Sequence, residues 1–173
     1  MSAEGIPPND PSAPGDIGTR VWRLTFAIRP LGNFLIWVAR YIDPLLHALT
    51  RGPLGGWTPF PFVSMTTTGA KSGQPRTSAV IYFSDADDLI LVASNYGGTR
   101  HPAWYHNLKA NPRAQLVRGR RSGTYTASEV TDEAERQRLF ALADRVYRGY
   151  AGYRERTDTI GRRIPIMRLR RTA

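Results

Sequence analysis

The sequence predicts a small, mostly antiparallel β-barrel of the α+β class with flanking helices, and two observations carry this prediction. Six or so short runs rich in β-branched and aromatic residues follow residue 61, separated by turn-forming Gly, Asp, Asn and Pro. Helical patterns are inserted only at the edges of this series. A chain of 173 residues is long enough to bury such a core without disulfides.

Three regions precede or form this barrel. Residues 1–19, rich in Pro, Gly, Ser and Asp, predict a disordered tail without the features of a secretory signal, so we expect a cytoplasmic protein. Residues 20–61 predict an amphipathic helical arm and a Gly- and Pro-rich linker. The arm, residues 20–50, mixes aromatic residues with arginine and is too charged to span a membrane. It could pack on the barrel, on a second subunit, or on the inner face of the membrane.

The barrel domain, residues 62–173, can be divided into elements from its residue pattern. Short β-branched runs between turn residues predict the strands, and proline or acidic residues in the first turn mark the starts of the helices. The predicted elements are strands 62–67, 77–84 and 89–94, a helix 102–110, a hairpin of strands 114–120 and 124–130 around residues 121–123, a helix from 131, and a closing strand 164–169.

Composition excludes several kinds of chemistry. The chain has no cysteine, and its three histidines show no metal-ligand spacing, so we expect no metal site. No Ser-His-Asp arrangement, paired-carboxylate signature or GxGxxG is present. The net charge of +10 arises mostly in residues 111–173. A solvated basic surface explains this charge better than nucleic-acid binding, because no RNP-type motif or helix-turn-helix accompanies it.

A glycine-bracketed turn between the first two strands is the strongest candidate binding element. Gly69 and Gly73 flank a turn that carries Lys71 and Ser72, and Gln74 and Arg76 follow. Backbone N–H groups and cations on such a turn can hold phosphate or carboxylate groups. It is not a P-loop, since the order of residues differs and no helix follows. An ordinary basic hairpin tip is the alternative interpretation.

Two other segments could complete a site at the same end of the barrel. The loop 94–101 and the helix start 104–107 both follow strand ends and bring Trp, Tyr and Asn side chains. Tyr147, Tyr150 and Tyr153, spaced three apart, would share a helix face, as core residues or beside a pocket. A site rich in Arg, Tyr and glycine loops but poor in carboxylates suits an anionic cofactor that itself carries the reaction.

Several spaced segments resemble the deazaflavin-dependent nitroreductase family. These are TTTGAKSGQPR at 66–76, LILVASNYGG at 89–98, HPAWYHNLKANP at 101–112, YRGYAGYRERT at 147–157 and IPI at 164–166. The resemblance implies a split β-barrel related to flavin-binding oxidoreductases and the cofactor coenzyme F420, with FMN less favoured. It further implies hydride transfer to an apolar electrophilic acceptor such as a quinone, an enone or a nitroaromatic. A non-catalytic F420 carrier and an FMN-dependent reductase stay open, as do a monomer and a homodimer.

The resemblance also implies residue roles. It places Ser94 and Tyr150 in catalysis and Ile81, Tyr147 and Tyr153 in the substrate pocket. The implied cofactor-binding residues are Ala70, Lys71, Ser72, Arg76, Thr77, Ser78, Ala79, Val80, Ile81, Ala93, Ser94, Asn95, Ala103, Trp104, Tyr105, His106, Asn107 and Tyr150. Ile81, Asn95 and Ala103 stand where a nitroreductase of this family has tyrosine, lysine and methionine, and the changes at Ile81 and Ala103 would alter the pocket. The arm is similar to one linked to membrane association in relatives.

Overall fold

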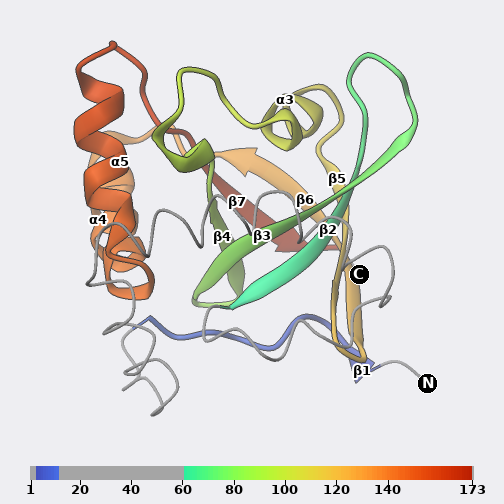
Figure 1. Cartoon of the computed structure of the whole chain (residues 1–173). Coiled ribbons are helices and arrows are strands. Elements are labelled where there is room, and N and C mark those ends of the chain that lie inside the picture. Colours follow the sequence, from blue (N-terminus) through green and yellow to red (C-terminus); the bar gives the residue numbers. More distant parts are fainter. Residues whose placement is uncertain (1–2, 12–60, 173) are drawn as a thin grey trace, which may run out of the picture.

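Six antiparallel strands close into a barrel in the computed structural model, which describes residues 3–11 and 61–172 (Figure 1). The strands are β2 (Phe62–Thr68), β3 (Pro75–Asp85), β4 (Asp88–Val92), β5 (Arg113–Arg118), β6 (Arg121–Glu129) and β7 (Ile166–Arg171). They pair in the order β6-β5-β2-β3-β4-β7, and a further β6–β7 pairing closes the ring. The predicted antiparallel barrel is therefore confirmed. The predicted arm, residues 20–50, lies outside the described residues.

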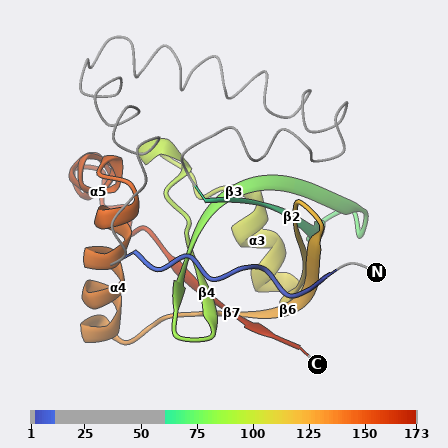
Figure 2. The same cartoon turned by 90° about the horizontal axis from the view of Figure 1, so that it is seen from below.

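Helices cover one side and one end of the barrel. Helices α4 (Glu133–Val146) and α5 (Gly149–Asp158) lie beside it, whereas α3 (Ala103–Ala110) lies across one end (Figures 1 and 2). Helix α4 begins two residues after the predicted start at 131, because Asp132 caps it: its carboxylate accepts a 2.8 Å hydrogen bond from the Glu135 N–H. These elements place the loops at the upper end of the barrel in Figure 1 next to α3 and α5.

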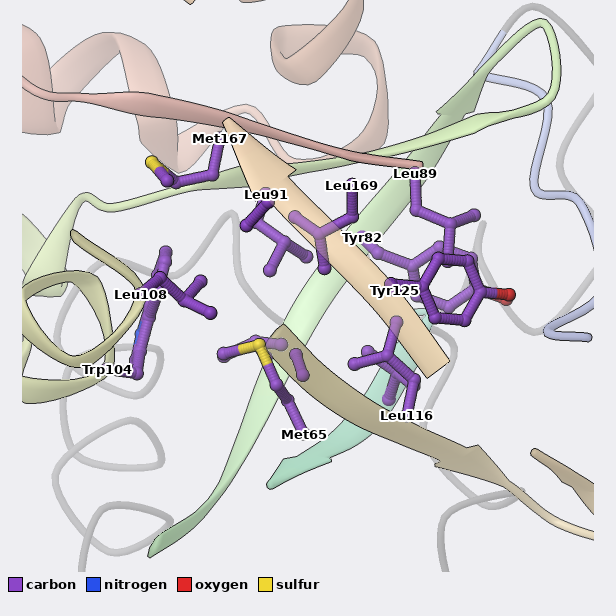
Figure 3. Packing of buried hydrophobic residues seen from close by; sticks show 14 of the residues in the cluster. Met65, Tyr82, Leu89, Leu91, Trp104, Leu108, Leu116, Tyr125, Met167 and Leu169 are labelled. Atoms are coloured by element: carbon purple, nitrogen blue, oxygen red, sulfur yellow. The ribbon is translucent and has the colours of Figure 1, made fainter. Parts of the chain in front are cut away.

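Successive side chains along each strand point alternately into and out of the barrel, and this separates two apolar layers. Inward-facing side chains such as Met65, Leu91 and Leu116 fill the barrel, and Trp104 and Leu108 of α3 close its upper end (Figure 3). The outer faces of β3 and β4 are apolar where the helices cover them. There Phe83, Ile90 and Val92 of the strands form a second cluster with Leu139, Phe140, Tyr150 and Tyr153 of α4 and α5. Strand β4 is buried on both faces, which explains its continuous apolar sequence.

The hairpin between β5 and β6 turns two residues earlier than predicted. The strands pair up to Arg118 and Arg121, so Gly119 and Arg120 form the connection in place of residues 121–123. Gly119 has a φ of +59°, the left-handed conformation that two-residue hairpin loops require at their first position. The prediction was wrong because a second glycine, Gly123, marked the apparent turn. Gly123 instead lies within β6, opposite Leu116.

The start of the chain also differs from the predicted disordered tail. Residues 3–11 cross the lower end of the barrel in Figure 1, and β1 (Ala3–Glu4) pairs with β6. Ile6 is buried in the barrel core, and its N–H donates to the Tyr125 hydroxyl over 3.0 Å. The Tyr82 hydroxyl donates to the carbonyl of Pro7 over 2.9 Å. One isoleucine and a few hydrogen bonds hold this segment. The amino-acid composition of residues 1–19 does not reveal these contacts, because they involve so few residues.

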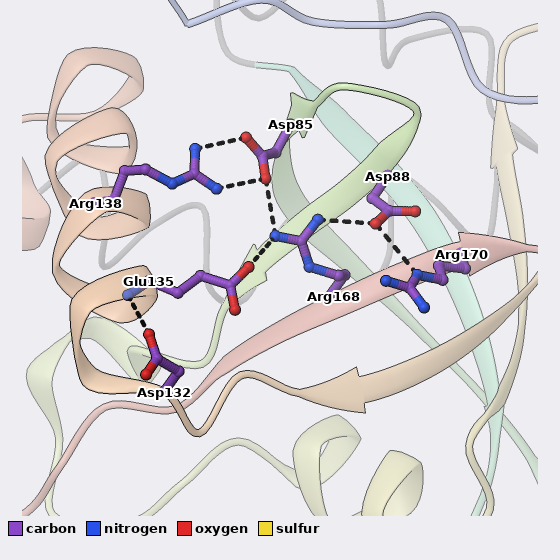
Figure 4. A network of polar contacts seen from close by, with 7 residues as sticks. All are labelled: Asp85, Asp88, Asp132, Glu135, Arg138, Arg168 and Arg170. Carbon is purple, nitrogen blue, oxygen red and sulfur yellow. Dashed lines mark hydrogen bonds and ion pairs between the residues drawn. The ribbon is translucent and has the colours of Figure 1, made fainter.

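An ion-pair network ties the β3–β4 turn to α4 and β7 and makes stability depend on pH (Figure 4). Asp85 accepts two 2.8 Å hydrogen bonds from Arg138 and one of 2.8 Å from Arg168. Hydrogen bonds from Arg138, against an opposing effect of burial, and further bonds from Arg168 lower the pKa of Asp85 to about 2. A lowered pKa means that this carboxylate stabilises the fold above its ordinary pKa and stops doing so as pH falls through about 2.

We expect Asp85→Asn to lower the free energy of unfolding by about 1–2 kcal/mol at pH 7, where the wild-type carboxylate is ionised. The difference should shrink as the pH falls towards 2, because the wild-type carboxylate is then protonated as well. Urea unfolding at several pH values measures it. Asp87→Asn, in the same turn but exposed, is the matched control and should change little. A difference that stays constant with pH would contradict the role given to Asp85.

Candidate cofactor and substrate site

The tip of the β2–β3 hairpin forms the basic turn that the sequence predicts. The Gly69 N–H donates to the Gln74 carbonyl over 2.9 Å, and the Gly73 N–H donates to the Gly69 carbonyl over 2.8 Å. A Cβ at Gly69 would lie 2.6 Å from the Ser72 hydroxyl and 3.1 Å from the Gln74 carbonyl, so only glycine allows this closure. The side chains of Lys71, Ser72 and Arg76 are exposed to solvent. Two cations and a hydroxyl can thus reach a ligand at this tip.

Asn107 of α3 anchors this tip to the barrel. Its side chain is 8% exposed, and its Oδ1 accepts a 2.9 Å hydrogen bond from the Ala70 N–H. Its Nδ2 donates to the Thr67 hydroxyl over 3.0 Å. The sequence suggested a helix cap or a ligand contact for Asn107. The structure shows a buried bridge that holds the basic turn against the helix.

We expect Asn107→Ala to destabilise the fold by about 1–3 kcal/mol, because it removes both hydrogen bonds and leaves the Ala70 N–H and the Thr67 hydroxyl short of a partner. Urea unfolding gives this difference. His106→Ala changes an exposed neighbour on the same helix and should alter stability by less than about 0.5 kcal/mol. Equal effects of the two substitutions would show that Asn107 does not anchor the turn.

The remaining predicted contacts on β3, β4 and α3 divide into exposed and buried sets. Along β3, Thr77 and Ala79 are exposed, and Ser78 and Ile81 are both half-buried. The predicted cofactor residues on α3 that stay accessible are Ala103, Tyr105 and His106, and the Ala70 side chain on the hairpin is exposed as well. The side chains of Val80, Ala93 and Trp104 pack in the barrel core. Strand alternation and helix periodicity explain this division, which sequence motifs alone do not reveal.

The loop after β4 has an unusual backbone. Asn95, Tyr96 and Gly97, which form the short 3₁₀ turn η2 (Asn95–Gly97), have φ values of 47°, 56° and 72°. Left-handed conformations cost non-glycine residues free energy, so contacts must hold them. The side-chain amide of Asn95 donates a 2.9 Å hydrogen bond to the Arg100 carbonyl. The guanidinium of Arg156 in α5 donates another of 2.9 Å to the Tyr96 carbonyl. The loop is therefore clamped against α5, with Tyr96 half exposed.

Four tyrosines gather where this loop meets α5. Tyr147 ends α4 and lies outside α5, so the three predicted tyrosines do not share one helix face. Their rings still pack together, with centroids 5.3 to 6.2 Å apart, and the Tyr147 and Tyr153 hydroxyls lie 2.9 Å apart. Tyr96 packs edge-on against Tyr153 at 6.5 Å. The break between the helices brings these rings together.

Burial controls the protonation of this cluster. Burial raises the pKa of Tyr150 far above its ordinary value, and the neighbouring Tyr147, Tyr96 and Asp144 raise it further. Burial and Tyr147 raise the pKa of Tyr153 in the same way. Both phenols therefore keep their protons at physiological pH, and they can donate hydrogen bonds but not act as bases.

A chain of contacts joins the predicted segments at the upper end of the barrel. Ser94 is buried, and its carbonyl accepts a 2.5 Å hydrogen bond from Arg162, which follows α5. Arg162 also contacts His101 over 3.0 Å, and the His101 ring packs 5.0 Å from Tyr105 of α3. Asn107 continues the chain from α3 to the basic turn. The sequence did not single out Arg162, whose only signal was its place among many arginines.

These features suit one class of protein, a small β-barrel oxidoreductase that uses an anionic redox cofactor. The chain belongs to the F420H(2)-dependent quinone reductase family, whose model matches residues 46–170. This match confirms the resemblance to deazaflavin-dependent enzymes, the split-barrel fold and coenzyme F420 as the cofactor. The chain is an oxidoreductase that depends on this cofactor.

Named relatives agree with this assignment. The F420H(2)-dependent quinone reductase Rv1261c of Mycobacterium tuberculosis is 35% identical over 146 residues, which cover 78% of this chain and 96% of the relative. A solved F420-H2 dependent reductase is 38% identical with a TM-score of 0.56, over 63% of this chain and 93% of that one. A second solved structure, described as a domain-swapped dimer, is 33% identical with a TM-score of 0.57, over 78% and 98% of the two chains.

No helix among residues 3–11 and 61–172 combines the length and apolarity needed to cross a bilayer. Within the same residues, no group of three or more His, Cys, Asp or Glu side chains is arranged to hold a metal ion.

Proposed function

We propose that this protein transfers a hydride from reduced coenzyme F420 to a quinone. Two features support the proposal: the exposed basic turn at the tip of the β2–β3 hairpin, and the cluster of protonated phenols where the loop after β4 meets α5. The first can hold an acidic tail and the second can contact an apolar, electron-accepting ring. The name of the Mycobacterium tuberculosis relative supports a quinone as the acceptor.

The residues of the basic turn suit the cofactor's acidic tail. Lys71, Ser72 and Arg76 offer two cations and a hydroxyl, and residues 66–84 contain no carboxylate to repel it. The outward residues Thr77, Ala79 and Ile81 of β3 continue from this turn and would lie beside the ring system. When bound, reduced deazaflavin would supply the hydride, and the residues of this site would hold the acceptor in position to receive it. Binding energy from the tail would thereby orient the ring.

Ser94 and Tyr150 are the proposed hydrogen-bond donors to the acceptor. Both are buried, so negative charge that develops on a quinone oxygen would be stabilised without competition from water. Tyr147 and Tyr153 would form the wall of the acceptor pocket together with Ile81. This arrangement needs no ionisable base, since both buried phenols stay protonated.

Cofactor binding and turnover test the proposal separately. Fluorescence quenching should give a lower Kd for F420 than for FMN. With reduced F420, a menaquinone analogue should be reduced faster than an enone or a nitroaromatic. Tight F420 binding with no oxidation across this panel would indicate a carrier protein instead. Stronger binding of FMN would favour an FMN-dependent reductase.

Peripheral membrane contact is a further part of this proposal. The predicted arm, residues 20–50, combines aromatic residues and arginine in a way that suits the interface of an anionic bilayer. A quinone acceptor dissolved in that bilayer would then be within reach of a cytoplasmic enzyme. Cosedimentation of the full chain with anionic vesicles, but not with neutral ones, is the expected result. A homodimer is the proposed assembly, by analogy with the domain-swapped relative.

A further inference from the structure

Arg162 is a buried arginine whose position is fixed by the end of α5. Gly161 has a φ of +66°, and its N–H donates to the Asp158 carbonyl over 3.1 Å. The Arg162 N–H donates to the Thr157 carbonyl over 2.8 Å, and these two bonds form a Schellman motif. Arg162 is 7% exposed. The helix end therefore holds its backbone in one place below the surface.

The contacts of this guanidinium are unusual for a buried cation. Its Nη2 donates to the Ser94 carbonyl over 2.5 Å and its Nη1 lies 3.0 Å from His101 Nδ1. Its Nε is buried without a hydrogen-bond partner, and no carboxylate within the described part of the chain forms an ion pair with it. Buried charges normally have such partners. A role in the adjacent site would explain why the cation is kept.

The geometry determines the protonation state of His101. Arginine has only N–H donors and cannot accept a hydrogen bond. His101 Nδ1 must therefore be the acceptor, which leaves the ring neutral with its proton on Nε2. Protonation of Nδ1 would break this bond and place two cations side by side. Arg162 thus selects both the charge and the tautomer of the ring.

We infer that Arg162 is a positioning residue that holds His101 as its Nε2–H tautomer, so that this N–H donates a hydrogen bond to an electron-rich carbonyl oxygen of the bound ligand. The inference deepens the proposed function and rests on it. The carbonyl belongs either to the cofactor ring or to the quinone, because both ligands carry one. Ser94 and His101 are tied to the same guanidinium, so their positions at the rim are coupled.

The charged and titratable neighbours of His101 determine how the ring responds to pH. Burial, Arg162 and His106 of α3 lower the pKa of His101, whereas Glu129 of β6 raises it. The Tyr105 ring packs against His101 and its hydroxyl donates to Glu129. Removing the Arg162 charge should therefore raise the pKa of His101.

Nitrogen-15 NMR of the full chain labelled at histidine tests the tautomer without cofactor or activity. In the wild type, His101 should carry its proton on Nε2 and titrate below the ordinary histidine range. Arg162→Met should move the titration to higher pH and mix the two tautomers. Arg162→Lys keeps the charge but lacks the planar guanidinium fork that spans both acceptors, so it should also mix the two tautomers. The control Arg163→Met, at an exposed neighbour, should leave His101 unchanged.

Kinetics then identify the ligand that accepts the hydrogen bond. His101→Phe keeps a ring but removes the donor. We expect either the affinity for F420 or the kcat/KM for the quinone to fall by at least about tenfold, and His101→Gln should restore part of this loss. A higher Kd for F420 assigns the bond to the cofactor. A lower kcat/KM for the quinone at an unchanged Kd for F420 assigns it to the acceptor. An Nδ1–H tautomer in the wild type, or unchanged Kd and kcat/KM in His101→Phe, would overturn the inference. A wild-type chain that binds no F420 would instead refute the proposed function.

Discussion

The double substitution Lys71→Ala and Arg76→Ala should weaken F420 binding by about 100-fold. Each charge-assisted hydrogen bond to an acidic tail is worth about 1.5 kcal/mol even at the lower end of its range, which corresponds to about tenfold in Kd. Both side chains are exposed, and neither contributes to the barrel core, so the fold should be retained. Fluorescence quenching with purified cofactor measures the change.

Salt and a matched charge deletion distinguish this local effect from general electrostatics. Wild-type affinity should fall as ionic strength rises, whereas the double variant should show a weaker salt dependence. Arg120→Ala with Arg121→Ala removes two exposed charges at the lower end of the barrel and should leave the Kd within about twofold. If the variant at positions 71 and 76 retains F420 as well as the wild type does, the basic turn is not the tail site.

Tyr150→Phe should reduce kcat for quinone reduction by about 100-fold with little change in the Kd for F420. The substitution keeps the buried ring and removes only the hydroxyl that we propose to stabilise charge on the acceptor oxygen. Because burial keeps this phenol protonated in the wild type, its removal should leave the shape of the pH profile unchanged. Stopped-flow oxidation of reduced F420 measures the chemical step.

Tyr153→Phe is the matched control on the same helix. Its hydroxyl pairs with that of Tyr147 at 2.9 Å, so the loss should appear as about 1 kcal/mol of stability and a changed KM. A fall in kcat as large as that of Tyr150→Phe would mean that the cluster acts as a unit, with no special role for Tyr150. An unchanged kcat in Tyr150→Phe would remove this residue from the proposed donors.

Local sequence patterns were sufficient for the barrel and for several elements of the site. Strand β2 and helix α3 lie within one residue of their predicted bounds, since proline, glycine and alternating apolar residues act over a few positions. The β5–β6 turn was misplaced because two glycines competed for it, and only strand pairing selects Gly119. The order of residues 3–11 depends on contacts with Tyr82 and Tyr125, far away along the chain.

The sequence by itself determined the basic turn at residues 69–76, the presence of a barrel and, through its resemblance, the cofactor class. Only the tertiary structure decided which residues of β3 are accessible, how Asn107 anchors the turn and where the tyrosines meet. It alone identified Arg162 as a partner of Ser94 and His101, residues more than sixty positions away. The reason is physical: turn chemistry depends on neighbours in the chain, whereas burial, protonation and long-range hydrogen bonds depend on which surfaces the closed barrel brings together.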